Sequence, residues 1–164
     1  MIIILPIIIF ILSIYAVPTA NSQVKAPQIP PKVEDNRIVR IRHFLESKNS
    51  PLASASADFV IFGDQYKIAP EILVGISKSE SNFEKAGDTT DNNPFGFRCT
   101  GTLPCLRFRD YRTAVWHLAK TLGTKPAYKR FRETGKVEDI ATNYLSGDKA
   151  RWSRTVSSVR EELK

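Results

Sequence analysis

The sequence predicts an α+β domain that is mostly helical and has one short, disulfide-stapled β-hairpin. Apolar residues recur every three or four positions over most of residues 36–164, which is typical of amphipathic helices around a core. The only cysteines, Cys99 and Cys105, are flanked by segments in which apolar and polar residues alternate, as they do in the strands of a hairpin. Residues 36–164 are long enough to form one domain with a sizeable core.

Residues 1–22 are expected to be a signal peptide outside the fold. Residues 2–17 are nearly all aliphatic but fewer than the roughly 20 that a spanning helix needs, and residues 20–22 form a small-x-small cleavage site. The segment lacks Lys and Arg, so an uncleaved N-terminal anchor is the alternative. Residues 23–35 contain three prolines and predict an extended linker, with the domain beyond it outside the cytoplasm.

Three helices are expected before the cysteines. Asn36 is expected to cap a helix that runs to about Lys48, and Ser54 or Ser56 to begin a second one. Pro70 suits the first turn of a third helix. The expected inward residues are Ile38, Ile41, Phe44 and Leu45 in the first helix, Phe59, Val60, Phe62 and Tyr66 in the second, and Ile72, Leu73, Ile76 and Phe83 along the third.

The region around the cysteines is predicted to be a loop followed by the hairpin. Residues 88–95 cannot continue a helix, because they include the sequence Asn-Asn-Pro. Cys99 and Cys105 flank a turn-like segment, and in an exported chain this spacing indicates one disulfide. Because His43 and His117 are distant in the sequence, a metal site is disfavoured, and no cofactor is expected.

Four more helices are expected after the hairpin, which makes seven in all. Asp110 caps one that ends at Gly123, and a short helix over residues 124–134 stops at Gly135. Another covers residues 137–145, and the last begins near Asp148. The expected core residues are Ala114, Val115, Leu118 and Leu122, and then Trp152, Val156, Val159 and Leu163.

Glu80 is the strongest candidate for a catalytic residue. It follows Ile76 by four residues and precedes Phe83 by three, so it projects along the apolar face of its helix. A carboxyl group that loses water there has a raised pKa, and a protonated carboxyl can protonate the leaving oxygen of a glycosidic bond. The alternative is that Glu80 lies at the edge of the helix end and turns to solvent.

The order of motifs resembles that of the lysozyme-like superfamily. Glu-Ser-x-Phe from Glu80, a polar loop and Asn93-Pro-Phe-Gly96 are similar to bacterial peptidoglycan endo-β-N-acetylglucosaminidase domains (mannosyl-glycoprotein endo-β-N-acetylglucosaminidase-like) and to soluble lytic transglycosylases. Residues 69–76 and 108–115 resemble family segments as well, as does Ile-Ala-x-x-Tyr144 with the later Trp and Val. The resemblance covers roughly residues 50–160 in family order.

The resemblance implies a lysozyme-like helical domain that is a secreted glycoside hydrolase. It would cleave β-1,4 bonds of peptidoglycan, with Glu80 as the general acid and no cofactor. Tyr144 matches a tyrosine near the reacting centre of the family, although it is equally explained as a core residue. The expected substrate-binding residues are Ser81, Asp91, Asn93 and Phe95.

The reaction type is left open because the second carboxylate is not identified. Asp88 and Asp91 lie in the loop after Glu80, while Asp110 is better explained as a helix cap. Some relatives manage with one glutamate, using the N-acetyl group of the substrate, and release an anhydro-sugar as lytic transglycosylases. The residues therefore allow hydrolysis or transglycosylation.

The charge and the absence of nucleic-acid motifs bear on the partners. The net charge of +7 attracts polyanions, and outside the cytoplasm anionic cell-wall polymers fit better than nucleic acid. We expect a monomer that touches the membrane only through an uncleaved N-terminus. The alternatives of another class are a non-catalytic wall-binding module, because residues 98–105 form a short substitute for a longer family region, and a membrane-active cationic protein using its last helix.

Overall fold

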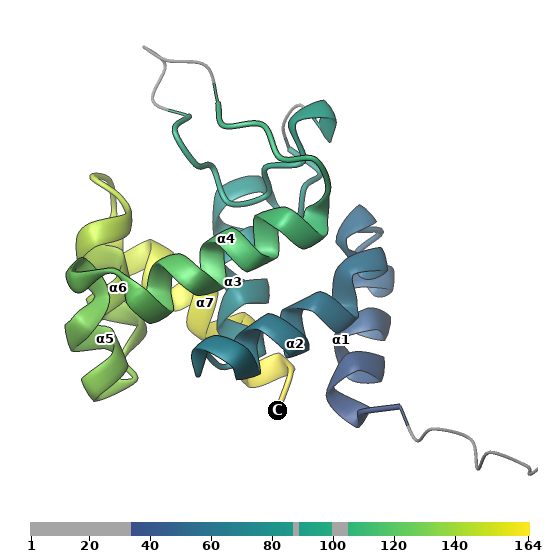
Figure 1. The fold of residues 1–164 in the computed structure, drawn as a ribbon, viewed down its shortest axis with the longest axis horizontal. Helices are drawn as coiled ribbons and strands as arrows, with labels where there is room; N and C mark the ends of the chain where they lie inside the picture. Colours follow the sequence, from purple (N-terminus) through teal and green to yellow (C-terminus); the bar gives the residue numbers. More distant parts are fainter. Residues whose placement is uncertain (1–33, 87–88, 100–104) are drawn as a thin grey trace, which may run out of the picture. The chain divides into compact units, whose positions relative to one another are not determined.

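The chain is mostly helical over residues 34–86, 89–99 and 105–164, which are the residues that the computed structural model describes. This part of the chain contains seven α-helices and no strand, so the predicted helical character is confirmed. The helices are α1 (Asn36–Ser47), α2 (Ser56–Tyr66), α3 (Pro70–Ser81), α4 (Tyr111–Thr124), α5 (Lys129–Thr134), α6 (Val137–Tyr144) and α7 (Lys149–Glu162), with 3-10 turns η1 (Pro51–Ala55), η2 (Thr89–Asp91) and η3 (Pro126–Tyr128) (Figure 1).

Side chains cap three of the helices. Asp110 accepts a hydrogen bond from the Thr113 N–H at 2.7 Å, and Asp148 caps α7 in the same way. The prediction that Asn36 caps α1 is wrong. The cap is Asp35, whose carboxylate accepts from the Arg37 N–H at 2.9 Å, so Asn36 is already the first helical residue.

The helix predicted over residues 124–134 is divided into η3 and α5. Lys125 has extended backbone angles, as expected for a residue that precedes a proline, and α4 therefore ends at Thr124. Gly135 ends α5 as predicted, in the left-handed conformation with φ +68°.

Helix α3 lies in the middle of the helical unit that spans Val33–Lys164, and its most extensive contact is with α7 (Figure 1). Gly75 makes this contact close, because a Cβ atom there would lie 2.8 Å from the Val156 carbonyl oxygen of α7. Ile72, Leu73 and Ile76 are almost completely buried. The core therefore fixes the direction of α3 and the position of the residues at its C-terminal end.

Residues 82–110 form the α3–α4 connection, and apart from the short turn η2 its described residues, 82–86, 89–99 and 105–110, have an irregular backbone. The predicted disulfide between Cys99 and Cys105 is present. Next to it the Leu106 N–H donates to the Phe97 carbonyl at 2.9 Å, and this bond joins the segment before Cys99 to the segment after Cys105. Residues 100–104, where the hairpin would turn, lie outside the described residues, as does Asp88. Within residues 88–95, which were predicted to be a loop, Thr89–Asp91 form the 3-10 turn η2.

Among the described residues no helix is both long and apolar enough to cross a membrane. The predicted signal peptide and nearly all of the predicted linker lie outside these residues.

Candidate active site at the end of helix α3

The backbone leaves the helical conformation directly after α3. Residues 82–84 all have positive φ angles, of 50°, 62° and 62°, and none of them is a glycine. The Ser81 hydroxyl accepts a hydrogen bond from the Glu84 N–H at 2.8 Å and donates to the Pro94 carbonyl at 2.9 Å. These two bonds bring the α3–α4 connection back onto the end of α3, one residue from Glu80.

The Glu80 carboxyl is partly buried and has a hydrogen-bond donor from another helix. Burial raises its pKa above the usual value, and the hydrogen bond from Trp152 lowers it by less. The Trp152 indole N–H of α7 donates to Oε1 of Glu80 at 2.6 Å. The expected rise in the pKa of Glu80 is therefore present, with burial as its main cause.

Gly96 brings the loop backbone against this carboxyl. Its φ is +65°, and a Cβ atom there would lie 3.0 Å from Oε2 of Glu80. A side chain at this position would be strained and would also crowd the carboxyl. Gly96 thus has a steric reason to be glycine.

Two cavities meet at Glu80. The smaller, of about 320 Å³, is enclosed by the end of α3 and the connection, and the larger, of about 640 Å³, lies between the connection and the end of α6. Glu80, Gly96 and Cys99 line both cavities. A third cavity, of about 520 Å³, includes Trp152 in its lining but not Glu80, so the two that share the carboxyl are the better candidate site.

Tyr144 lies in the wall of the larger cavity and also packs on the core. Its hydroxyl donates to the Phe95 carbonyl at 2.8 Å, and its ring centroid is 5.6 Å from that of Trp152. Burial first, and then the charge of Glu80, hold its pKa well above the usual value, so the phenol keeps its proton. Its proton is engaged by the Phe95 carbonyl, so the phenol has no second proton to donate to the cavity.

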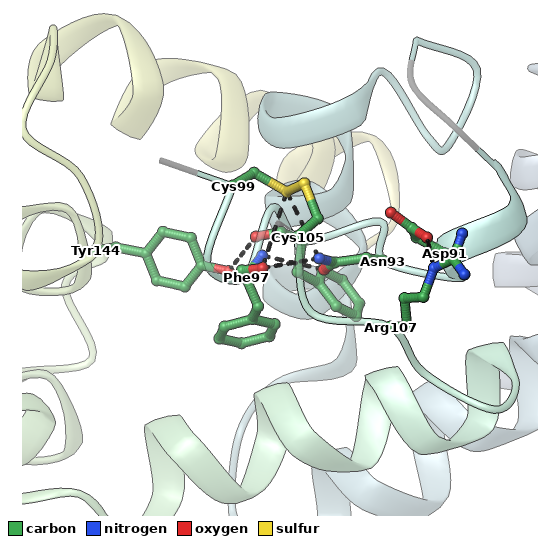
Figure 2. Close-up of a disulfide and its surroundings, with 8 residues drawn as sticks. Asp91, Asn93, Phe97, Cys99, Cys105, Arg107 and Tyr144 are labelled. Carbon is green, nitrogen blue, oxygen red and sulfur yellow. Dashed lines mark hydrogen bonds and ion pairs between the residues drawn. A yellow bond between two sulfur atoms is a disulfide. The ribbon is translucent and has the colours of Figure 1, made fainter. Parts of the chain in front are cut away.

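The predicted substrate-binding residues Ser81, Asn93 and Phe95 are buried in the wall of the site. The Asn93 carboxamide accepts from the Phe97 N–H at 3.0 Å and donates to the Phe97 carbonyl at 2.9 Å, which closes the turn below the disulfide (Figure 2). Ser81 and Asn93 line the smaller cavity, and Phe95 lines the larger one. Contacts of these residues with a substrate stay predictions.

Two further carboxylates share the smaller cavity with Glu80. Asp91 lines it and forms an ion pair with Arg107 (Figure 2). Glu84 lines it too and is 4% exposed. Asp110 is explained as the cap of α4, as predicted.

Reasoning from the sequence missed that Glu84 lines the smaller cavity and that Trp152 donates to Glu80. Glu84 follows Glu80 by four residues, but α3 ends between them, so helical spacing does not relate their positions. Trp152 was predicted as a core residue, and it is buried. The available signal was that a buried indole N–H requires an acceptor, although the sequence does not say which one.

A scan against protein-family models and a search of curated proteins found no match to this chain.

Proposed function

We propose that the protein is an exported peptidoglycan glycosidase of the lysozyme-like kind, which cleaves β-1,4 bonds of the glycan strand with Glu80 as the general acid. The observation that carries this proposal is the position of the Glu80 carboxyl, which is partly buried where two cavities meet and has a raised pKa. A raised pKa favours the protonated carboxyl, which can give its proton to a glycosidic oxygen, and two adjoining cavities offer room for sugars on both sides of the bond.

In the proposed reaction Glu80 gives its proton to the glycosidic oxygen while the bond to the anomeric carbon breaks. The positive charge that develops on the sugar would be stabilised by the phenol oxygen of Tyr144 and by the carboxylates of the smaller cavity. Ser81, Asn93 and Phe95 would hold the turn that forms the cavity wall.

Hydrolysis is the favoured outcome because Asp91 lies in the cavity of Glu80 beside Arg107. A second carboxylate beside the acid is what a hydrolase uses to activate water or to attack the sugar. A lytic transglycosylase would instead use the substrate's own groups. The two products differ in mass by one water molecule, so mass spectrometry of the released sugars separates the two reactions.

The lysozyme-like fold and the β-hairpin belong to the same proposal. They are supported by an acid at the end of a central helix, a connection folded back over it, and the bond between Leu106 and Phe97 beside the disulfide. The net charge of +7 suits anionic cell-wall polymers, and residues 1–22 would export or anchor the protein.

Glu80→Gln tests the proposal, because the amide keeps the shape of the side chain but has no acidic proton. Clearing of purified cell walls, followed by turbidity, should fall by about 10²–10⁴-fold. Glu71→Gln is the matched control, because Glu71 is in the first turn of the same helix, pairs with Arg40, and lines neither of the two cavities at Glu80. Sedimentation with the walls should stay unchanged in both variants. Retention of more than a tenth of the activity by Glu80→Gln contradicts the assignment, and wall binding without any clearing by the wild type indicates a non-catalytic module.

A further inference from the structure

We propose that Trp152 orients the Glu80 carboxyl and determines which of its oxygens carries the proton: the indole N–H holds Oε1, so the proton is on Oε2, on the side of Gly96. The orientation stands on the geometry alone, and its catalytic consequence rests on the proposed function. Trp152 is in this sense a positioning residue, since it acts through Glu80.

The donor chemistry of the two groups determines the site of the proton. An indole N–H can only donate a hydrogen bond, so Oε1 of Glu80, at 2.6 Å, must accept. A proton on Oε1 directed along the same line would face the indole hydrogen. The protonated carboxyl has one O–H group, and the arrangement without this repulsion puts it on Oε2.

Oε2 is the oxygen beside Gly96, the residue that lines both cavities together with Glu80 and Cys99. A Cβ atom at Gly96 would lie 3.0 Å from this oxygen, so any side chain there would crowd it. The space beside Oε2 is therefore bounded by backbone rather than by a side chain. A glycosidic oxygen that lies across the two cavities would meet the oxygen that carries the proton.

The indole is itself held firmly. Trp152 is buried, and its ring lies against that of Tyr144 at an interplanar angle of 35°. Its helix α7 approaches α3 closely at Gly75. The orientation of Glu80 thus depends on a side chain 72 residues away in the sequence, through the packing of two helices.

The hydrogen bond has a definite effect on the pH dependence. It stabilises the charged carboxylate, so it lowers the pKa of Glu80, against the larger rise from burial. Trp152→Phe removes the donor and should raise this pKa further. The general acid would then stay protonated to higher pH, and the alkaline limb of the activity profile should move to higher pH.

The direct test observes the indole N–H groups of the wild-type chain by NMR during a pH titration. The protein has two tryptophans, Trp116 and Trp152, so two resonances are expected, and Trp116→Phe assigns them. The Trp152 resonance should shift with a midpoint above the usual glutamate value of about 4.3, and Glu80→Gln should abolish the shift. A Trp152 resonance that does not titrate, or that titrates equally in Glu80→Gln, overturns the inference.

Kinetics of Trp152→Phe, with Trp116→Phe as the matched control, add the catalytic consequence. A misoriented acid should lower kcat by about 10–100-fold with KM nearly unchanged and with the alkaline limb moved upward, whereas Trp116→Phe should behave as wild type. A fall in kcat without a shift of the alkaline limb contradicts the role of the hydrogen bond.

The two proposals can fail separately. If walls are never cleared but the Trp152 resonance titrates, the proposed function fails and the orientation of Glu80 stands. If Glu80→Gln abolishes clearing but the resonance does not titrate, the inference fails alone.

Discussion

The two regions that meet at Glu80 are built in different ways. Helix α3 is regular, and its apolar residues are buried against α2 and α7. The α3–α4 connection is irregular and contains five of the seven non-glycine residues with positive φ in the described part of the chain. Apolar burial therefore fixes the helix that carries Glu80, whereas polar contacts and a disulfide fix the connection that forms the cavity wall.

The backbone of the connection has an energetic cost that local contacts must offset. A non-glycine residue in the left-handed region costs about 1–3 kcal/mol, and Phe83 and Glu84 are adjacent examples. The ring of Phe83 packs edge-on against Phe44 with centroids 5.6 Å apart, and its carbonyl accepts from the Ser50 hydroxyl at 2.8 Å. Backbone strain clusters at functional sites, and here it lies beside the cavity of Glu80, where it lets the connection return to the end of α3.

The largest effect on stability should come from the buried face of α3. Ile76 has no exposed surface, so Ile76→Ala should lower the free energy of unfolding by about 2–5 kcal/mol through lost burial and a cavity. Ile61→Ala is the control, because Ile61 on α2 is 46% exposed and should change stability by no more than about 0.5 kcal/mol. Chemical denaturation followed by circular dichroism measures both. Equal losses would mean that burial does not distinguish α3 from the surface.

Removal of the disulfide should have a smaller effect, confined to the connection. Replacing Cys99 and Cys105 together by serine should cost about 2 kcal/mol on the chain-entropy model, while the helical signal survives. Both cysteines line the smaller cavity, so affinity for the glycan should fall before the domain unfolds. The same should hold for the reduced wild type. Equal affinity in both redox states would mean that the connection does not contact the glycan.

The same contrast explains how much could be predicted from the sequence. Helical periodicity predicts the inner face of α3 correctly, because burial in a helix follows the spacing of apolar residues. It fails after Ser81, where left-handed residues end the helix and change the direction of Glu84. The contact between Trp152 and Glu80 joins two helices far apart in the sequence, and no local pattern predicts such a pair. At α1 the neighbouring Asp35 and Asn36 both suit a cap, so the exact boundary was missed.

The smallest effect on stability, but a measurable one on activity, is expected from Asp91→Asn. Its matched control is Asp139→Asn, because each aspartate pairs with an exposed arginine and the two carboxylates have similar exposed fractions, 17% and 14%. Exposed pairs contribute about 0–1 kcal/mol, so both variants should stay folded. Of these two aspartates only Asp91 lines the cavity of Glu80, so Asp91→Asn should slow wall clearing and Asp139→Asn should not, if a second carboxylate operates. Asp91→Asn should also slow clearing more than Asp88→Asn does. Full activity in both the Asp91 and the Asp88 variants would leave Glu80 acting with the substrate's N-acetyl group, and the released product should then be the anhydro-sugar, lighter by one water molecule.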